Sequence, residues 1–230
     1  MKKVLLSLAM LSIISTPVLA KAPVANLKIN GDIKPPTCTI NGATQRDVIF
    51  DYGVISPTLI PQSTVYSYSD IGVQNTVTIE CDAKTYLTFT ASDTYADTEL
   101  SVNNTSGWFH LVDKANPETA VGAAFFAWDN VTVDSKPAYI SRANDVSITG
   151  TSYNNALYKG PTNGWTSQQT SVDKNALALI SGEIFQASFR QGMTMSTFIL
   201  SRDELSKKGI DLSNGLDFMG EAVLTFNFGV

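Results

Sequence analysis

Ala25-Asn-Leu-Lys-Ile-Asn-Gly-Asp-Ile33 alternates apolar and polar residues along its whole length. One face carries Ala25, Leu27, Ile29, Gly31 and Ile33, and the other carries only Asn, Lys and Asp side chains. A period of two is that of a β-strand with one face in an apolar core and the other in water. Because this segment stands near the start of the chain, it could pair within its own sheet or lie in the apolar groove of another molecule.

The first 20 residues have the pattern of a secretory signal peptide. Lys2 and Lys3 give a positive start, residues 4–14 are apolar, and Val18-Leu-Ala20 is a small-residue cleavage site. We therefore expect a mature chain that begins near residue 21, is exported and has no membrane-inserted segment. The remaining length of about 210 residues favours one elaborated domain.

The composition favours an all-β extracellular protein. The full chain has a formal charge of −5, and removing Lys2 and Lys3 with a leader that holds no acidic residue gives −7. A negative chain is not expected to bind nucleic acid or an anionic membrane surface. Only 16% of the residues are charged, while Ser, Thr, Asn, Gly, Tyr and Phe are abundant, as in β-rich domains outside the cell.

Cys38 and Cys81 are the two cysteines of the chain. An even number of cysteines in an exported protein favours a disulfide over free thiols or a metal site. A zinc site needs more ligands than these two cysteines and the single histidine, His110, provide. We therefore expect a Cys38–Cys81 disulfide, no metal and no cofactor.

Short β-branched and aromatic segments, separated by Gly, Pro, Asn, Asp and Ser clusters, predict strands throughout the chain. The predicted strands are 37–41, 47–54, 75–81, 85–91, 108–112, 122–128, 147–151, 176–180, 184–189 and 221–230. One helical turn is predicted at 201–208, where Ser201 and Glu204 form a capping-box pattern before Gly209. The polar stretch 129–175 is predicted as long loops or an insertion. This pattern indicates a β-sandwich or barrel.

The last ten residues, Glu221-Ala-Val-Leu-Thr-Phe-Asn-Phe-Gly-Val230, form a second alternating segment. Its apolar face carries Ala222, Leu224, Phe226, Phe228 and Val230. A closing strand of this kind is ordinary in a sandwich. Its combination with an alternating segment at the other end of the chain is less ordinary.

The chain resembles the subunits of chaperone–usher fimbriae. The resemblance rests on the two alternating ends, on Gly31-Asp-Ile-Lys-Pro-Pro-Thr-Cys38, on the segment 47–53, and on Ile79-Glu-Cys81 and Phe185-Gln-Ala-Ser-Phe189. It implies an all-β fold: an incomplete immunoglobulin-like β-sandwich at residues 34–230 that lacks its last strand, preceded by a donor-strand extension at residues 21–33. It also implies donor-strand exchange, in which a periplasmic chaperone lends each subunit a strand until the next subunit's extension replaces it.

The resemblance also implies roles for individual residues. Ala25, Leu27, Ile29, Gly31 and Ile33 would form the donor face, and Leu224, Phe226, Phe228 and Val230 the groove edge and chaperone contact. The Cys38–Cys81 disulfide would link two early strands. The implied partners are a periplasmic fimbrial chaperone, an outer-membrane usher and neighbouring subunits, with host or surface glycans as further candidates. The implied location is an extracellular fimbrium on the bacterial surface.

Other functions remain open at this point. The chain could be a self-contained secreted β-sandwich lectin or adhesin whose N-terminal strand pairs within its own sheet. Trp128, Tyr153, Tyr158 and Trp165 could form a sugar-binding platform, although aromatic residues at strand ends more often pack under loops. An enzyme is not expected, because a catalytic triad would have to be built around the single His110 and the acidic residues are scattered through loops.

Overall fold

The computed structural model describes residues 25–229, except 69–72, 101, 103–104 and 192–195. The predicted signal peptide and Val230 lie outside the described residues. The chain divides into an N-terminal unit that ends at Lys34 and a larger unit, Pro35–Val230.

In the N-terminal unit, residues 25–34 form no helix or strand. The side chains of Leu27, Ile29 and Ile33 are almost completely exposed, at 97%, 99% and 103%. A single extended segment leaves its backbone hydrogen-bonding groups to water and has no second layer against which to bury an apolar face. The alternation of residues 25–33 is therefore not satisfied inside this unit.

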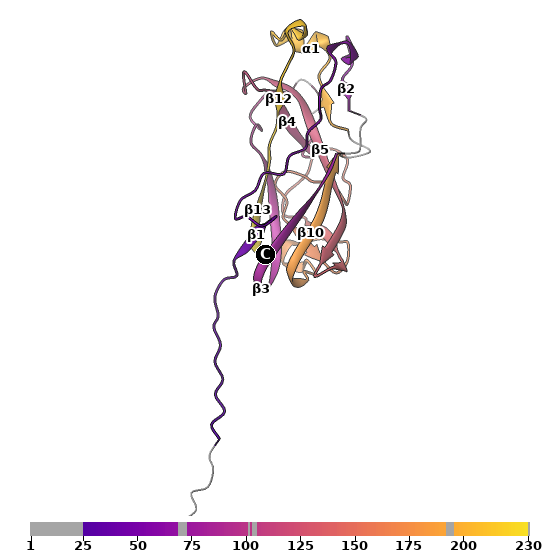
Figure 1. The fold of residues 1–230 in the computed structure, drawn as a ribbon. Coiled ribbons are helices and arrows are strands. Elements are labelled where there is room, and N and C mark those ends of the chain that lie inside the picture. Colours follow the sequence, from indigo (N-terminus) through magenta and orange to yellow (C-terminus); the bar gives the residue numbers. More distant parts are fainter. Residues whose placement is uncertain (1–24, 69–72, 101, 103–104, 192–195, 230) are drawn as a thin grey trace, which may run out of the picture. The chain divides into compact units, whose positions relative to one another are not determined.

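The larger unit is all-β, as the sequence predicts, and has a sandwich-like fold (Figure 1). Its strands are β1 (Cys38–Ile40), β2 (Tyr66–Ser67), β3 (Gln74–Asp93), β4 (Trp108–Asp113), β5 (Ala120–Val133), β6 (Lys136–Pro137), β7 (Tyr139–Ala143), β8 (Asn163–Thr166), β9 (Ser171–Val172), β10 (Ser181–Gln191), β11 (Phe198–Ile199), β12 (Phe218–Met219) and β13 (Ala222–Phe228). Its helices are α1 (Arg202–Lys207) and the 3-10 turns η1 (Pro57–Leu59), η2 (Lys174–Ala176) and η3 (Leu212–Asn214).

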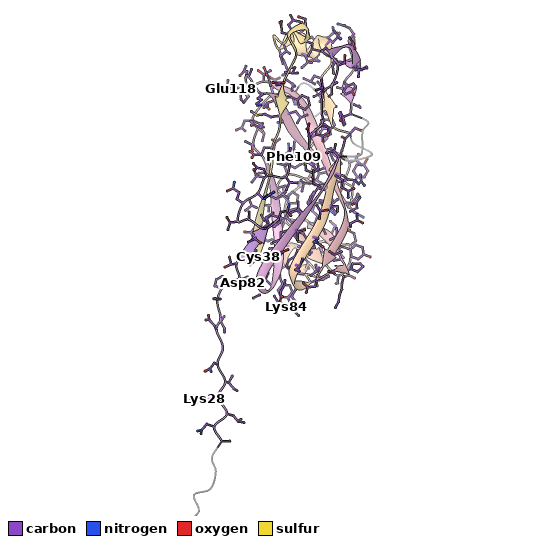
Figure 2. The ribbon with its side chains drawn as sticks, viewed as in Figure 1. Lys28, Cys38, Asp82, Lys84, Phe109 and Glu118 are labelled. Atoms are coloured by element: carbon purple, nitrogen blue, oxygen red, sulfur yellow. A yellow bond between two sulfur atoms is a disulfide. The ribbon has the colours of Figure 1, made fainter. Side chains whose placement is uncertain are left out.

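Strand β3 belongs to both layers of the sandwich. Its first part pairs with β1 and β10, and its last part pairs with β8 and β13. Between them, the pairing with β10 shifts register, because Gly182 lies opposite Thr85 while Ile184 lies opposite Glu80. This bend of β3 passes the chain from one layer to the other, and Figure 2 labels Asp82 and Lys84 in it.

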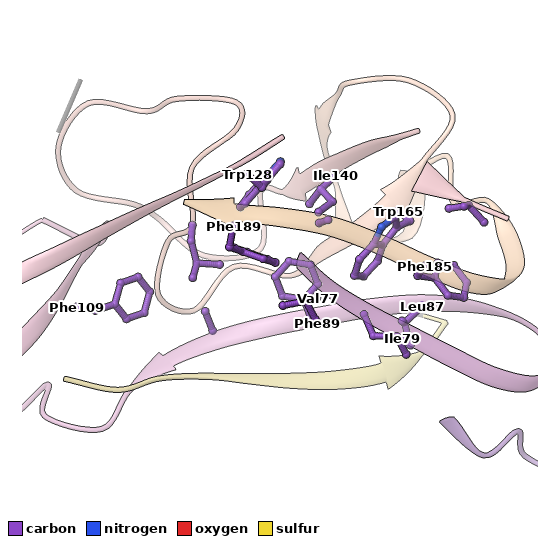
Figure 3. Packing of buried hydrophobic residues seen from close by; sticks show 14 residues of the cluster. Val77, Ile79, Leu87, Phe89, Phe109, Trp128, Ile140, Trp165, Phe185 and Phe189 are labelled. Atoms are coloured by element: carbon purple, nitrogen blue, oxygen red, sulfur yellow. The ribbon is translucent and has the colours of Figure 1, made fainter. Parts of the chain in front are cut away.

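The main core lies between the two layers. Val77, Ile79, Phe185, Ala187 and Phe189 come from β3 and β10 in one layer, and Leu87, Phe89, Ile140 and Trp165 come from β3, β7 and β8 in the other. Figure 3 shows Trp165 close to Phe185, with 5.5 Å between ring centroids. Burying a large side chain stabilises by about 1.5–3 kcal/mol, so this cluster accounts for much of the stability of the unit.

A second apolar cluster packs α1 against β5 and β11. Leu205 of α1 is fully buried with Val121, Phe198 and Leu200. The helix begins as the sequence predicts, because the Ser201 side chain accepts a hydrogen bond from the backbone N–H of Glu204 at 3.2 Å. Gly209, with φ of 80°, follows it.

Three sequence predictions about elements are wrong. Residues 47–54 and 147–151 form no strand, and 176–180 contains the end of η2 and no strand. The polar stretch 129–175 is also more regular than predicted, because it holds the end of β5 and the short strands β6, β7, β8 and β9. A segment with strand propensity forms a strand only where the edge of another strand is available for pairing. Strand β8 pairs with such an edge on β3.

Candidate functional site

A long, mainly apolar groove of about 950 Å³ lies within the unit Pro35–Val230. Residues 44–50 and Tyr52 line one wall, and residues 218–226 and Phe228 line the other. The floor consists of side chains from the main core and its edge: Val77, Ile79, Leu87, Phe109, Phe126, Leu157 and Phe189. The groove therefore opens directly onto the space between the two layers of the sandwich.

Strand β13 forms one wall with its alternating face. Ala222, Leu224 and Phe226 are half-buried, whereas the residues between them are exposed. The Phe226 ring lies 5.8 Å from Phe89 and 6.5 Å from Trp165, measured between centroids. Strand β13 pairs with β3 along one edge, and no strand in the described part of Pro35–Val230 pairs with its other edge. Backbone donors and acceptors along the groove are thus open to a further strand.

The opposite wall is an extended segment that joins no sheet among the residues described in this unit. Val48, Phe50 and Tyr52 are half-buried, and the residues between them are exposed. The Phe50 ring lies 5.1 Å from Phe126, and the Asn75 side chain donates a hydrogen bond to the Ile49 carbonyl at 2.9 Å. Half-buried and exposed residues alternate along this segment, but its backbone forms no ladder of hydrogen bonds with a neighbouring strand.

One end of the groove lies at the bend of β3. Cys38 pairs with Cys81 and is bonded to it by a disulfide, which confirms the predicted bridge. Phe228 pairs with Leu87 on the other side of the bend. Thr37 and Asp82 exchange two further hydrogen bonds, from Thr37 N to Asp82 Oδ1 at 2.8 Å and from Asp82 N to the Thr37 carbonyl at 3.0 Å. Figure 2 shows Cys38 beside Asp82 at this end.

A buried polar cluster lies beside the groove, and two of its members, Tyr95 and His110, help to line it. The Asp93 carboxylate accepts a hydrogen bond from the backbone N–H of His110 at 3.0 Å and lies 3.5 Å from Lys159 Nζ. His110 Nδ1 lies 2.8 Å from the Tyr95 carbonyl oxygen, and because a carbonyl only accepts, Nδ1 carries the hydrogen. His110 is fully buried, and its contacts are those of a structural residue.

Tyr52 anchors the wall at residues 44–52 to the rest of the unit. Its hydroxyl lies 3.0 Å from Thr197 Oγ1, and its ring meets Tyr68 edge-on at 4.6 Å between centroids. Burial raises the pKa of Tyr52, and the hydrogen bond with Thr197 offsets part of that rise. The phenol therefore stays neutral and can serve as a hydrogen-bonding group at neutral pH.

The structure places the predicted site residues in two groups. Leu224, Phe226 and Phe228 line the groove from β13, while Val230 lies outside the described residues. Ala25, Leu27, Ile29, Gly31 and Ile33 lie exposed in the N-terminal unit. Sequence reasoning did not assign the second wall to the groove, although the alternation of Val48, Phe50 and Tyr52 was a signal for it. It also gave no role in the groove to His110.

One protein-family model matches residues 27–125, and its description is "Protein of unknown function (DUF1120)". The match covers less than half of the 230 residues. It spans part of the N-terminal unit, the wall at residues 44–52, all of β3 and the start of β5. No curated protein and no solved structure matches the chain.

The structure does not present the aromatic residues as a sugar-binding platform. Trp128, Tyr158 and Trp165 are buried in the core, and Tyr153 is half-buried. Arg142 lies 4.4 Å from the centre of the Tyr158 ring and donates hydrogen bonds to the carbonyl oxygens of Tyr153 and Ala156. Trp128 and Trp165 belong to the main core, and Tyr158 and Tyr153 pack in a smaller cluster, so the four side chains do not form an exposed platform.

No group of three or more His, Cys, Asp or Glu side chains suited to a metal ion occurs among the described residues. No helix in that part of the chain has the length and apolar character needed to cross a membrane. The geometry that stands out is an apolar groove beside an unpaired strand edge, which suits the addition of a β-strand.

Proposed function

We propose that this chain is a structural subunit of a surface fimbria, exported through the periplasm and assembled by the chaperone–usher route. In this proposal the groove between β13 and residues 44–52 receives a donor strand. A periplasmic chaperone supplies the first strand, and residues 25–33 of a neighbouring subunit replace it at an outer-membrane usher. The finished fibre contributes to adhesion.

The observation that carries the proposal is that one chain has both an unfilled groove and an exposed apolar strand-like segment. The groove offers apolar floor and an unpaired strand edge, and residues 25–33 offer an exposed apolar face with strand periodicity. Their sizes are comparable, because nine residues of strand span about 26 Å and the wall from Phe218 to Phe228 spans at most about 33 Å at 3.3 Å per residue. Each surface supplies what the other lacks.

The energetics also support strand addition. Burying Leu27, Ile29 and Ile33 contributes roughly 5–9 kcal/mol at 1.5–3 kcal/mol per side chain, before the cost of ordering the extension. A ladder of backbone hydrogen bonds along β13 adds to this and fixes the register. An unfilled groove exposes core side chains and a strand edge, a combination that promotes aggregation. A chaperone that covers the groove during export removes that hazard.

Periplasmic expression tests the proposal. The full mature chain and a deletion of residues 21–33 are each produced with and without a co-expressed periplasmic fimbrial chaperone. We expect both chains to aggregate or be degraded when produced alone, and both to be recovered as one-to-one complexes when the chaperone is present. The deleted chain should form no polymer when its complex is released, whereas the full chain should form one.

A matched control uses the full chain with Leu224→Asp in β13. This substitution places a charge on the groove wall, so the chaperone complex should no longer form. Recovery of the full chain as a stable monomer without chaperone, combined with loss of that stability on deletion of residues 21–33, would favour the lectin-like alternative. In that case the extension would be a strand of its own domain.

A further inference from the structure

We infer that Lys34-Pro35-Pro36 keeps the N-terminal extension out of the groove of its own chain and so reserves residues 25–33 for a second copy. This inference rests on the proposed function, namely that the groove takes a strand. It adds a device that decides whether the strand comes from the same molecule or from another one. A strand can enter beside β13 in either of two directions, antiparallel or parallel to it.

Antiparallel entry of the chain's own extension is prevented by its reach. Strand β13 runs from Ala222 to Phe228, which pairs with Leu87 just after the bend of β3, whereas Cys38 pairs with Cys81 just before it. A donor antiparallel to β13 places Ala25 at the bend and Ile33 at the far end. The five residues from Ile33 to Cys38 span at most about 18 Å, whereas β13 is about 20 Å long and the groove continues to Met219. The tether is too short.

Parallel entry requires the chain to reverse within Lys34-Pro35-Pro36. The reversal cannot move further along the chain, because Thr37 exchanges two hydrogen bonds with Asp82 and Cys38 is bonded to Cys81. It cannot move back without withdrawing Ile33 from the groove. The turn is therefore confined to three residues, and reversals of the chain this tight usually use right-handed helical positions together with a left-handed one.

All three positions of that turn conflict with the residues present. Lys34 and Pro35 each precede a proline, which disfavours the right-handed helical region for both. Pro36 has φ fixed near −65° and cannot occupy the left-handed position. Pro35 and Pro36 also lack the N–H groups that would begin a ladder. An antiparallel partner strand from a second copy meets none of these obstacles.

Binding of a synthetic peptide tests the inference on the mature full-length chain. The peptide has the sequence of residues 21–33 and is added during refolding of the oxidised protein, and its stoichiometry is measured by native mass spectrometry. The wild-type chain should take up one peptide and remain monomeric. The double variant Pro35→Asn and Pro36→Gly, which supplies a hairpin turn, should fold as a monomer and lose peptide binding. A tethered strand acts at an effective concentration of about millimolar, which micromolar peptide does not match.

A triple variant that adds Ile29→Asp to the double variant is the matched control. Its tethered strand should leave the groove, so peptide binding should return, which also shows that the body has folded. Unchanged peptide binding by the double variant would overturn the inference and leave the proposed function standing. A wild-type monomer that refuses the peptide until residues 21–33 are deleted would overturn it as well, because the extension would already fill its own groove. If the peptide binds none of these chains, the proposed function is overturned too.

Discussion

Asp134 is a residue whose backbone and side chain both fix a turn. It has φ of 48°, and Ser135 after it has φ of 62°, so the chain reverses between β5 and β6 in a left-handed turn. The Asp134 carboxylate accepts hydrogen bonds from the backbone N–H groups of Ile184 and Glu183, both at 2.9 Å. These donors lie where the pairing of β10 shifts register. The carboxylate therefore fills a gap in the ladder.

We expect Asp134→Asn to lower the free energy of unfolding by about 1 kcal/mol at neutral pH, after allowance for its exposure. The hydrogen bonds from the backbone N–H groups of Ile184, which has the larger effect, and of Glu183 hold the pKa of Asp134 below its usual value. A lowered folded-state pKa stabilises above the unfolded-state pKa, and this contribution is lost as pH falls through the folded-state value. Urea unfolding of the strand-filled protein at several pH values should show the difference in stability between wild type and variant becoming smaller in acid. Asp32→Asn, in the N-terminal unit, is the control and should have the stability of the wild type at neutral pH.

Between the elements β12 and β13, Gly220 allows the chain to pass close over β4. A Cβ atom at this position would lie 2.7 Å from the His110 carbonyl oxygen and 2.7 Å from Leu111 Cδ2. The backbone oxygen cannot move aside without disturbing the pairing of β4 with β5. This close approach anchors the start of β13, and with it one wall of the groove.

Gly220→Ala should therefore destabilise the unit by about 1–3 kcal/mol, the usual cost of overpacking. Thermal unfolding of the variant in its strand-filled or chaperone-bound form measures this loss. Gly31→Ala is the control, because a Cβ atom at Gly31 meets no atom within 4 Å. Equal melting temperatures for wild type and Gly220→Ala would mean that β13 is not held at this point.

The elements that the sequence predicted well are those with local signals. The capping pattern located α1, period-two alternation located β13, and β-branched and aromatic composition located the core of β10. Residues 75–81 and 85–91 were predicted as two strands, and the structure joins them into β3 through its bend. The segment 47–54 has strand propensity but no partner edge in the described structure, so propensity alone misassigned it. The groove brings together residues 44–52 and 218–228, a long-range arrangement that no local pattern encodes.

On the scale of the whole molecule, the N-terminal extension and the groove should be separable by mutation. We expect Ile29→Asp to abolish polymerisation, because Ile29 is on the apolar face of the extension and a buried, unpaired carboxylate is strongly unfavourable. The stability of Pro35–Val230 in its chaperone complex should not change, since the Ile29 side chain is 99% exposed. Electron microscopy and size-exclusion chromatography after chaperone release would measure the fibres.

Asn30→Asp adds the same charge to the opposite face of the extension and is the matched control for Ile29→Asp. Fibres should still form, because residue 30 faces water when Leu27, Ile29 and Ile33 are buried. Loss of fibres in both variants would indicate that charge alone, rather than the face that carries it, prevents assembly.

The disulfide of Cys38 has a mechanical consequence. A pull on the N-terminal end of the chain enters the larger unit at β1, a strand of three residues at the edge of the sheet. Without the disulfide, such a pull would peel β1 from its neighbour one hydrogen bond at a time. The bond to Cys81 carries the load across to β3 instead, which is held by four other strands, β1, β8, β10 and β13. The oxidised molecule is thus suited to bear tension in shear across its central strand, and the reduced one would unzip from its edge.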